Sequence, residues 1–255
     1  WYNFQLKIAN KLIFSKWREA LGGNVNAIAS GSAALQARLA RIFMAAQIPV
    51  MEGYGLTETS PVVSVNSEDH GVLFGSVGTV IDGVEVKIAE DGEILVKGPN
   101  VMIGYYNNPE ATAQVIDADG WFHTGDIGEF VKGKFLKITD RKKEIFKTSG
   151  GKYVAPQVME NRFKASRFIE QIVVIGENRK FPAALIVPSY DFVREWAKRK
   201  EITVGNSNDE LIKNEQVIKR IELEVEAFNK EFGKFEQIKK IKLLPKELSI
   251  DGGEL

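Results

Sequence analysis

The sequence contains no cysteine and only two histidines, His70 and His123, in 255 residues. Disulfides, thiolate metal sites and cysteine nucleophiles are therefore excluded, and two isolated histidines cannot form a zinc site unless carboxylates complete it. No apolar run reaches the roughly 18 residues of a membrane-spanning helix. The lack of cysteine favours a cytoplasmic protein.

The sequence also lacks an excess of charge of either sign, because 34 Lys and Arg residues balance 34 Asp and Glu residues. A nucleic-acid-binding surface needs clustered basic residues, so nucleic acid is not expected as a partner. The second half is mildly basic, which suits either an anionic ligand or lysines that solvate helix faces. With 44% hydrophobic and 27% charged residues, the composition is that of a folded chain of one or two domains.

Three familiar site motifs are missing. The sequence has no G-x-x-x-x-G-K-[ST] phosphate loop and no G-x-S-x-G nucleophile elbow. Gly53-Tyr54-Gly55 lacks the third glycine of the dinucleotide fingerprint. Neither a P-loop nucleotide-binding protein nor an α/β-hydrolase is therefore indicated.

Residues 1–75 have the order that is typical of a parallel α/β layer. An amphipathic helix over 3–20 ends at Gly22-Gly23, and a strand over 25–29 follows. A turn then leads to a helix over 33–47 and a buried strand over 48–51. This strand–turn–helix–strand order predicts parallel strands.

Residues 76–139 change to short strands between glycines, which predicts a small antiparallel sheet or β-barrel. Two hairpins are expected, at 84–97 and at 127–138. From residue 140 the pattern becomes α+β, and the predicted elements are helices over 156–165, 190–199 and 209–232 and strands over 172–176, 183–188 and 238–244. We therefore expect a large domain over 1–139 and a small mobile domain over 140–255.

The segment from Glu52 to Pro61 is the first candidate site. Glycines on both sides of Tyr54 let a flat ring lie close to the backbone, which suits stacking on a heterocycle. Thr57 offers a hydroxyl to a phosphate, and Glu58 offers the carboxylate that Mg²⁺ prefers beside ligand phosphates. The alternative is a glycine-rich turn with a packed tyrosine.

Two further segments carry candidate residues. Within Gly120–Asp126, the carboxylate of Asp126 suits the two hydroxyls of a ribose, although a hairpin with a surface aspartate is the alternative. Within Asp140–Lys152, basic residues and two glycines predict a hinge that binds anions, with a solvated linker as the alternative.

Taken in order, these segments resemble the core motifs of the adenylate-forming acyl-CoA synthetases, and most closely those of the long-chain fatty acid–CoA ligases. The resemblance rests on Tyr54–Glu58, Gly120–Asp126, Asp140-Arg141 and Ser149-Gly150-Gly151. It implies that ATP and a fatty acid give an acyl-adenylate and pyrophosphate, and that CoA then displaces AMP.

The resemblance also implies roles for single residues. The nucleotide-binding residues that it implies are Gly31, Ser32, Ala33, Glu52, Gly53, Tyr54, Gly55, Thr57, Asp126, Arg141 and Lys143. Tyr54 is expected to stack on adenine, Thr57 to contact the α-phosphate and Glu58 to bind Mg²⁺. Asp126 and Arg141 are expected to hold the ribose.

In the small domain, the resemblance implies a hinge at Asp140 and Lys143 and a CoA-facing loop at Ser149-Gly150-Gly151. It adds Lys147 to Thr57 and Glu58 as a third catalytic residue, which reaches the nucleotide or the carboxylate.

The chain departs from the family pattern in two places. The family's glycine-, serine- and threonine-rich phosphate loop is missing, and no lysine follows the segment 248–255. We therefore expect a C-terminal fragment of a larger ligase that is inactive alone.

Several alternatives stay open at this point. Another acyl acceptor or a non-catalytic nucleotide-binding module would use the same motifs. A peripheral contact with the inner face of the membrane, through a helix that carries Phe4, Ile8 and Leu12 among lysines, and a homodimer also remain alternatives.

Overall fold

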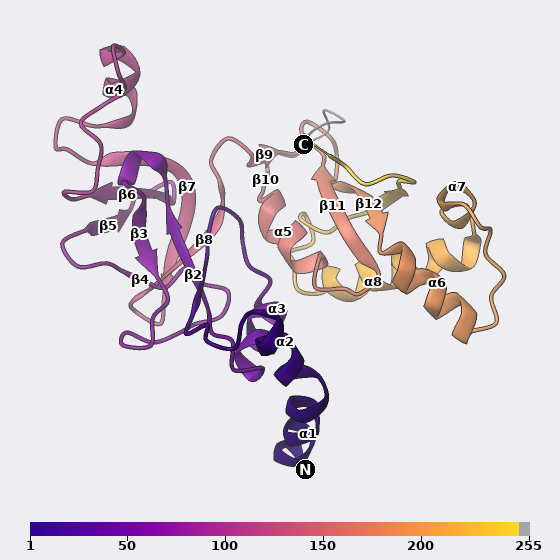
Figure 1. Ribbon diagram of the computed structural model, residues 1–255. Coiled ribbons are helices and arrows are strands. Elements are labelled where there is room, and N and C mark those ends of the chain that lie inside the picture. Colours follow the sequence, from indigo (N-terminus) through magenta and orange to yellow (C-terminus); the bar gives the residue numbers. More distant parts are fainter. Residues whose placement is uncertain (250–255) are drawn as a thin grey trace. The chain divides into compact units, whose positions relative to one another are not determined.

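The computed structural model describes residues 1–249, apart from the side chain of Tyr2 (Figure 1). The chain divides into two compact units, which we describe separately: unit 1 covers residues 1–142 and unit 2 begins at Lys143. The segment 248–255, which resembles the C-terminal segment of the family, lies mostly outside the described residues.

Unit 1 is built on one eight-stranded sheet. In spatial order its strands are β1 (Ile28–Ser30), β2 (Val50–Gly55), β3 (Val62–Val65), β4 (Thr79–Val80), β8 (Phe135–Arg141), β7 (Phe122–Val131), β6 (Glu93–Lys97) and β5 (Glu85–Ile88). Strands β1 and β2 pair in parallel, as predicted, and the remaining pairs are antiparallel.

The predicted α/β layer and the predicted antiparallel unit are thus parts of one continuous sheet. Among the described residues, no pairing joins β1 to β5, so the sheet stays open and the β-barrel is not confirmed. Both predicted hairpins are present. The turn of the β7–β8 hairpin contains Lys132 and Gly133 at φ 49° and 76°, the positive values that match the twist of the flanking strands.

The helices of unit 1 differ from the prediction mainly at their ends. The predicted helix over 3–20 is confirmed as α1 (Tyr2–Ala9), a π-helical segment (Asn10–Phe14) and α2 (Ser15–Ala20). Helix α3 (Ala37–Ala45) begins later than predicted, because Gln36 before it has an extended backbone and Ser32 has a positive φ of 65°, so neither residue is helical. Helix α4 (Pro109–Val115) was not predicted; Asn108 caps it by accepting the amide of Ala111 at 3.0 Å.

Unit 2 is the predicted α+β unit. Its three-stranded sheet has the order β11 (Ile169–Ile175), β12 (Ala183–Pro188) and β13 (Lys240–Leu243), with β11 antiparallel and β13 parallel to β12. A short hairpin of β9 (Phe146–Lys147) and β10 (Tyr153–Val154) precedes it. The helices are α5 (Pro156–Phe163), α6 (Tyr190–Arg199), α7 (Asn208–Leu211) and α8 (Glu215–Asn229). The predicted helix over 209–232 is therefore broken, because Asn214 caps α8 through the amides of Gln216 and Val217.

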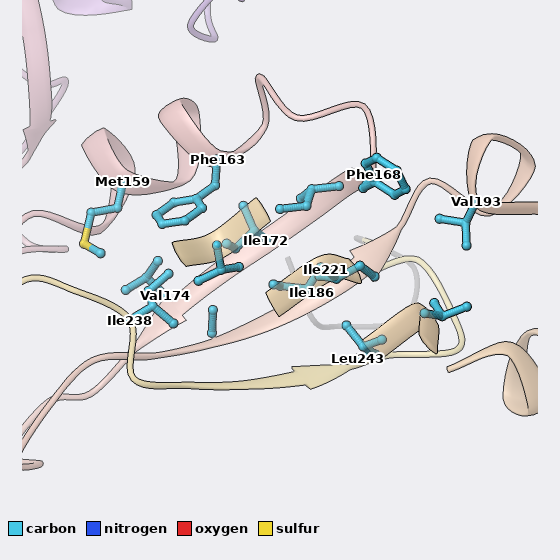
Figure 2. Packing of buried hydrophobic residues seen from close by; sticks show 14 of the residues in the cluster. Met159, Phe163, Phe168, Ile172, Val174, Ile186, Val193, Ile221, Ile238 and Leu243 are labelled. Carbon is cyan, nitrogen blue, oxygen red and sulfur yellow. The ribbon is translucent and has the colours of Figure 1, made fainter. Parts of the chain in front are cut away.

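Each unit has its own hydrophobic core. In unit 2, Phe163, Ile172, Ile186 and Ile221 belong to the buried cluster between the sheet and its helices, which Figure 2 shows. A fully buried side chain of this size contributes about 1.5–3 kcal/mol. The core of unit 1 includes Tyr54, which brings a polar hydroxyl into an apolar cluster. None of the described helices has the length and apolar character that crossing a membrane requires.

Candidate nucleotide site

Tyr54, Asp126 and Arg141 come from three strands and meet at one point of unit 1. The hydroxyl of Tyr54 donates to Oδ2 of Asp126 at 2.6 Å, and Nε of Arg141 lies 3.7 Å from the other carboxylate oxygen. Asp126 and Arg141 are paired across β7 and β8. Tyr54 and Asp126 are each 9% exposed, whereas Arg141 is exposed. The site therefore has a buried acceptor and an accessible cation.

The tyrosine keeps its proton in this setting. Burial and the neighbouring Asp126 carboxylate raise the pKa of Tyr54 above its usual value. At neutral pH the hydroxyl is a donor, so it fixes one oxygen of Asp126. The ring belongs to the core cluster, as the packed-tyrosine alternative expects, while its hydroxyl faces the predicted site.

The segment Gly53-Tyr54-Gly55 forms the end of β2, so it is not the glycine-rich turn that the sequence left open as the alternative. The geometry nevertheless requires glycine at residue 55, because an added Cβ would lie 1.6 Å from the carbonyl oxygen of Pro61. At Gly31 an added Cβ would make only an ordinary contact, 3.6 Å from the carbonyl oxygen of Gly53. The glycines let the chain of residues 53–62 reverse tightly behind Tyr54.

Residues 31–33 lie beside this strand end. Ser30 of β1 pairs with Glu52 of β2, so Gly31, Ser32 and Ala33 continue from the neighbouring strand and are exposed. The buried Glu52 carboxylate accepts the amide of Leu35 at 2.9 Å, and this bond holds the loop that follows residues 31–33. Burial raises the pKa of Glu52, and this amide opposes the shift.

Thr57 and Glu58 lie in a short 3₁₀ turn (Thr57–Thr59) directly after β2. Thr57 is exposed, and the Glu58 carboxylate accepts the hydroxyl of Tyr105 at 2.9 Å. The main-chain oxygen of Glu58 accepts the amide of Met102 at 2.7 Å. Tyr105 was missed at the sequence level, because it is 47 residues from Glu58 and belongs to no predicted motif.

Glu58 is the carboxylate that the Thr57–Thr59 turn offers to Mg²⁺. Among the described residues there is no group of three or more His, Asp or Glu side chains arranged for a metal. Mg²⁺ commonly uses one or two carboxylates together with ligand phosphates and water. Glu58 fits that pattern only in the presence of a bound polyphosphate.

Four charged or titratable side chains next to the site were also missed. Glu93 is 4% exposed, and its carboxylate contacts Lys142 Nζ at 2.9 Å and His123 Nδ1 at 3.0 Å. Lys142 Nζ also lies 2.7 Å from Asp91. Burial raises the pKa of Glu93, but Lys142, His123 and the amide of Gly125 together hold it below its usual value. The sequence signal was an acidic residue at a buried position of the apolar strand β6.

The remaining predicted residues lie at the end of unit 1 and in unit 2. Asp140 lies inside β8 and is fully buried, with its Oδ1 accepting the amide of Arg141 at 2.6 Å. This position differs from the prediction of a mobile link at Asp140. Lys143, the first residue of unit 2, is exposed.

Lys147 and the glycine loop belong to the β9–β10 hairpin. Lys147 is exposed on β9, with Nζ 4.6 Å from the ring centre of Tyr153. Ser149-Gly150-Gly151 forms the exposed tip of the hairpin, and Gly151 has φ 73°. The amide of Ser149 donates to the carbonyl oxygen of Arg179 at 2.8 Å, which ties the loop to the rest of unit 2.

The chain matches known protein families over most of its length. Residues 4–106 match the AMP-binding enzyme family, and residues 143–250 match the AMP-binding enzyme C-terminal domain. Long-chain-fatty-acid–CoA ligase FadD15 of Mycobacterium tuberculosis is 40% identical over 97% of this chain and 41% of its own length. Long-chain-fatty-acid–CoA ligase 5 of Rattus norvegicus is 39% identical over 96% of this chain and 38% of its own length.

Solved structures agree with these matches. The adenylation domain of a carboxylate reductase from Mycobacterium chelonae superposes with a TM-score of 0.71 at 25% identity, covering 97% of this chain and 38% of that one. O-succinylbenzoate coenzyme A synthetase from Bacillus subtilis, in complex with AMP, gives a TM-score of 0.64 at 25% identity over 87% of this chain and 43% of that one. This chain thus spans about two fifths of the curated relatives it matches, and it belongs to the AMP-binding enzymes, with long-chain-fatty-acid–CoA ligases as its homologues.

Proposed function

We propose that the whole protein carrying this chain is an AMP-forming long-chain fatty acid–CoA ligase. In the first step the fatty acid carboxylate attacks the α-phosphorus of ATP, and pyrophosphate leaves. In the second step the thiol of CoA attacks the acyl carbon, and AMP leaves. The observation that carries the proposal is the grouping of Tyr54, Asp126 and Arg141 in a chain 40% identical to such ligases.

The proposed nucleotide site uses the residues of unit 1. Asp126 accepts the ribose hydroxyls, since its carboxylate is already oriented by one hydrogen bond. Arg141 adds a positive charge beside it. The adenine lies along Gly31–Ala33 and Glu52–Gly55, with Tyr54 as the stacking ring.

The chemistry of the first step is mainly a matter of charge, since two anions must approach each other. Thr57 is the proposed contact of the α-phosphate, and Glu58 is the proposed protein ligand of Mg²⁺. When bound, Mg²⁺ supplies charge that offsets the repulsion between carboxylate and phosphate. Lys147 is the second proposed source of positive charge.

The second step is proposed to use unit 2. Lys143 is the hinge residue, because it is the first residue beyond unit 1 and its side chain is exposed. Ser149-Gly150-Gly151 is the proposed CoA-facing loop, whose small residues leave room for a narrow ligand arm. A change of orientation between the steps would give each half-reaction its own set of groups.

A second candidate function is adenylation with a different acyl acceptor. The similarity to the adenylation domain of a carboxylate reductase, at a TM-score of 0.71, favours it. Such an enzyme would form acyl-AMP from ATP and a fatty acid but would not need CoA. A non-catalytic nucleotide-binding module would bind AMP and form neither product.

One assay separates these functions. The whole protein is incubated with ATP, Mg²⁺ and oleate, with and without CoA, and the products are measured by mass spectrometry. The proposed ligase makes oleoyl-CoA, AMP and pyrophosphate when CoA is present; oleoyl-AMP that CoA does not consume supports the other acceptor. Asp126→Ala should slow turnover at low ATP concentration, because the nucleotide binds more weakly, whereas Asp82→Ala, a change at an exposed aspartate of the same unit, should not. Absence of both products with active controls would refute the proposal.

Peripheral membrane contact is a further proposal. Helix α1 and the π-helical segment expose Phe4, Ile8 and Leu12 near Lys7 and Lys11, a composition that suits an interfacial helix. Flotation of the whole protein with anionic vesicles, before and after Leu12→Glu, tests it. Equal flotation of the two proteins would count against it. A homodimer and a cytoplasmic location stay predictions.

A further inference from the structure

The buried carboxylate of Glu93 joins the two strand segments that carry Asp126 and Arg141. Its Oε1 accepts the amide of Gly125 at 2.9 Å, and its Oε2 accepts Lys142 Nζ at 2.9 Å. Gly125 directly precedes Asp126, and Lys142 directly follows Arg141. The Glu93 side chain therefore holds the residue next to Asp126 and the residue next to Arg141.

The sheet is irregular at this point, which explains why a side chain is needed. Glu93 pairs with Ile127 but Leu95 pairs with His123, so the regular ladder is interrupted opposite residues 124–126. At a bulge, backbone groups lose their regular partners. Gly125 has φ 74° and donates its amide to Glu93, and Asp126 donates its amide to Thr124 Oγ1 at 3.1 Å.

The two strand segments are also bonded directly to each other. The amide of Lys142 donates to the carbonyl oxygen of Gly125 at 2.8 Å. Glu93 thus closes a ring of contacts that runs from its own carboxylate through Gly125 to Lys142 and back. A shift of either segment has to break a member of this ring.

The groups around the Glu93 carboxylate favour its ionised form, which accepts these hydrogen bonds. The groups facing its carboxylate are the Lys142 ammonium, the His123 ring and the Gly125 amide. Asp91 shares Lys142 at 2.7 Å from the exposed side. A buried carboxylate with a cation and two further donors retains its charge, because each contact favours the ionised form.

We infer that Glu93 is a positioning residue, which holds Asp126 and Arg141 at the separation that a ribose with two free hydroxyls requires. The inference rests on the proposed nucleotide site. Glu93 acts through Gly125 and Lys142 and is not itself a ligand of the nucleotide.

The test is AMP binding by the whole protein, measured by isothermal titration calorimetry. Glu93→Gln should weaken AMP by roughly tenfold, an effect of the size that supporting residues have in other sites. Lys142→Met should also weaken AMP binding, and it leaves the contact between Glu93 and Gly125 in place. It is therefore the variant to test if Glu93→Gln does not fold. The matched control is Lys137→Met, which removes a lysine of β8 whose partner is the exposed Glu129 at 3.2 Å. It should leave AMP affinity unchanged.

A double-mutant cycle distinguishes positioning from general destabilisation. If Glu93 acts through Asp126, Glu93→Gln should change AMP affinity less than about twofold once Asp126→Ala is present. Independent, additive losses would overturn the inference while leaving the proposed function intact.

Amide hydrogen exchange without nucleotide provides the second readout. Residues 124–126 and 141–142 should exchange faster in Glu93→Gln but not in Lys137→Met. Unchanged exchange would overturn the inference on structural grounds. If the unaltered protein did not bind AMP, the proposed function would fail together with the ribose part of the inference, and the exchange data would still decide whether Glu93 holds these segments.

Discussion

The hydroxyl of Tyr54 and the carboxylate of Asp126 are 72 residues apart in the sequence and 2.6 Å apart in the structure. Both groups are buried, so the bond between them is shielded from water. A hydrogen bond to a charged group contributes about 1.5–3 kcal/mol. It links the strand before the Thr57–Glu58 turn to the strand that carries the proposed ribose acceptor.

Tyr54→Phe should separate the role of the ring from that of the hydroxyl. The ring remains, so packing and any stacking on adenine are retained, while the Asp126 carboxylate loses its donor. We expect a loss of about 1.5–3 kcal/mol in the free energy of unfolding by urea denaturation, and weaker AMP binding. Tyr106→Phe, at an exposed tyrosine, is the control. Equal behaviour of the two variants would show that the bond to Asp126 has no energetic role.

Asp126→Ala should weaken ATP and AMP selectively. The ribose loses an ionised acceptor, which corresponds to about 1.5–3 kcal/mol, or roughly tenfold or more in dissociation constant. The affinity for the fatty acid should change little. Calorimetric titrations of the whole protein with each ligand measure both. A nucleotide affinity that does not change would remove Asp126 from the site.

Lys143→Pro should affect the two half-reactions differently. Proline fixes φ near −65° and restricts the residue before it, so a hinge at this position would lose its freedom. Acyl-adenylate formation should largely survive, and thioester formation should collapse. Pyrophosphate release in a single turnover, compared with acyl-CoA yield from preformed acyl-adenylate, measures the two steps.

The control for this hinge test is Lys143→Ala, which removes the charge of residue 143 and keeps its backbone freedom. It should spare both steps more than proline does. If proline slows both half-reactions by one factor, or only the first, the hinge lies elsewhere.

Gly55→Ala should destabilise the first unit strongly. The new methyl group would meet the carbonyl oxygen of Pro61 at 1.6 Å, so the backbone has to move. Overpacking of this kind costs about 1–3 kcal/mol or more. Gly31→Ala, where the added atom makes an ordinary contact at 3.6 Å, is the matched control. Urea denaturation that fails to separate the two variants would contradict the tight reversal after β2.

The stability of the chain should depend on pH through Glu93. Its pKa lies below the ordinary value of 4.5 in the folded state, so the unfolded state binds the proton more readily. The stabilisation is therefore complete well above pH 4.5 and is lost as the pH falls through the folded pKa. Urea denaturation at several acidic pH values measures how the free energy of unfolding depends on pH. Glu93→Gln should reduce this dependence, and Glu129→Gln should not. Identical slopes in all three proteins would rule out a contribution from Glu93.

Local patterns predicted much of the fold. The strand over 183–188 and the helix over 190–199 have the predicted bounds, because alternation and the i, i+3, i+4 pattern are properties of neighbouring residues. The break between α7 and α8 was missed, since the apolar pattern runs on while Asn214 caps the second helix. Capping depends on the conformation of one residue, which a periodic pattern does not show.

The site was predictable only in part. Motif order singled out Tyr54, Asp126 and Arg141, but their contact depends on β2, β7 and β8 joining one sheet through strands that are distant in the chain. The roles of Glu93 and Tyr105 were not visible, because each acts on a residue more than 30 positions away. Such pairings arise from sheet topology and not from local propensity.

The bulge between β6 and β7 makes the number of residues in β7 part of the site. Side chains alternate between the two faces of a strand, so the loss or gain of one residue turns every later side chain to the opposite face. From the Leu95–His123 pair to the Glu93–Ile127 pair, β7 advances by four residues and β6 by two, so deletion of Gly125 would still leave β7 one residue longer than β6 and would reverse the face of the Asp126 carboxylate relative to His123. A one-residue change of length here is therefore more damaging than most changes of side chain, because it moves the acceptor without altering its chemistry.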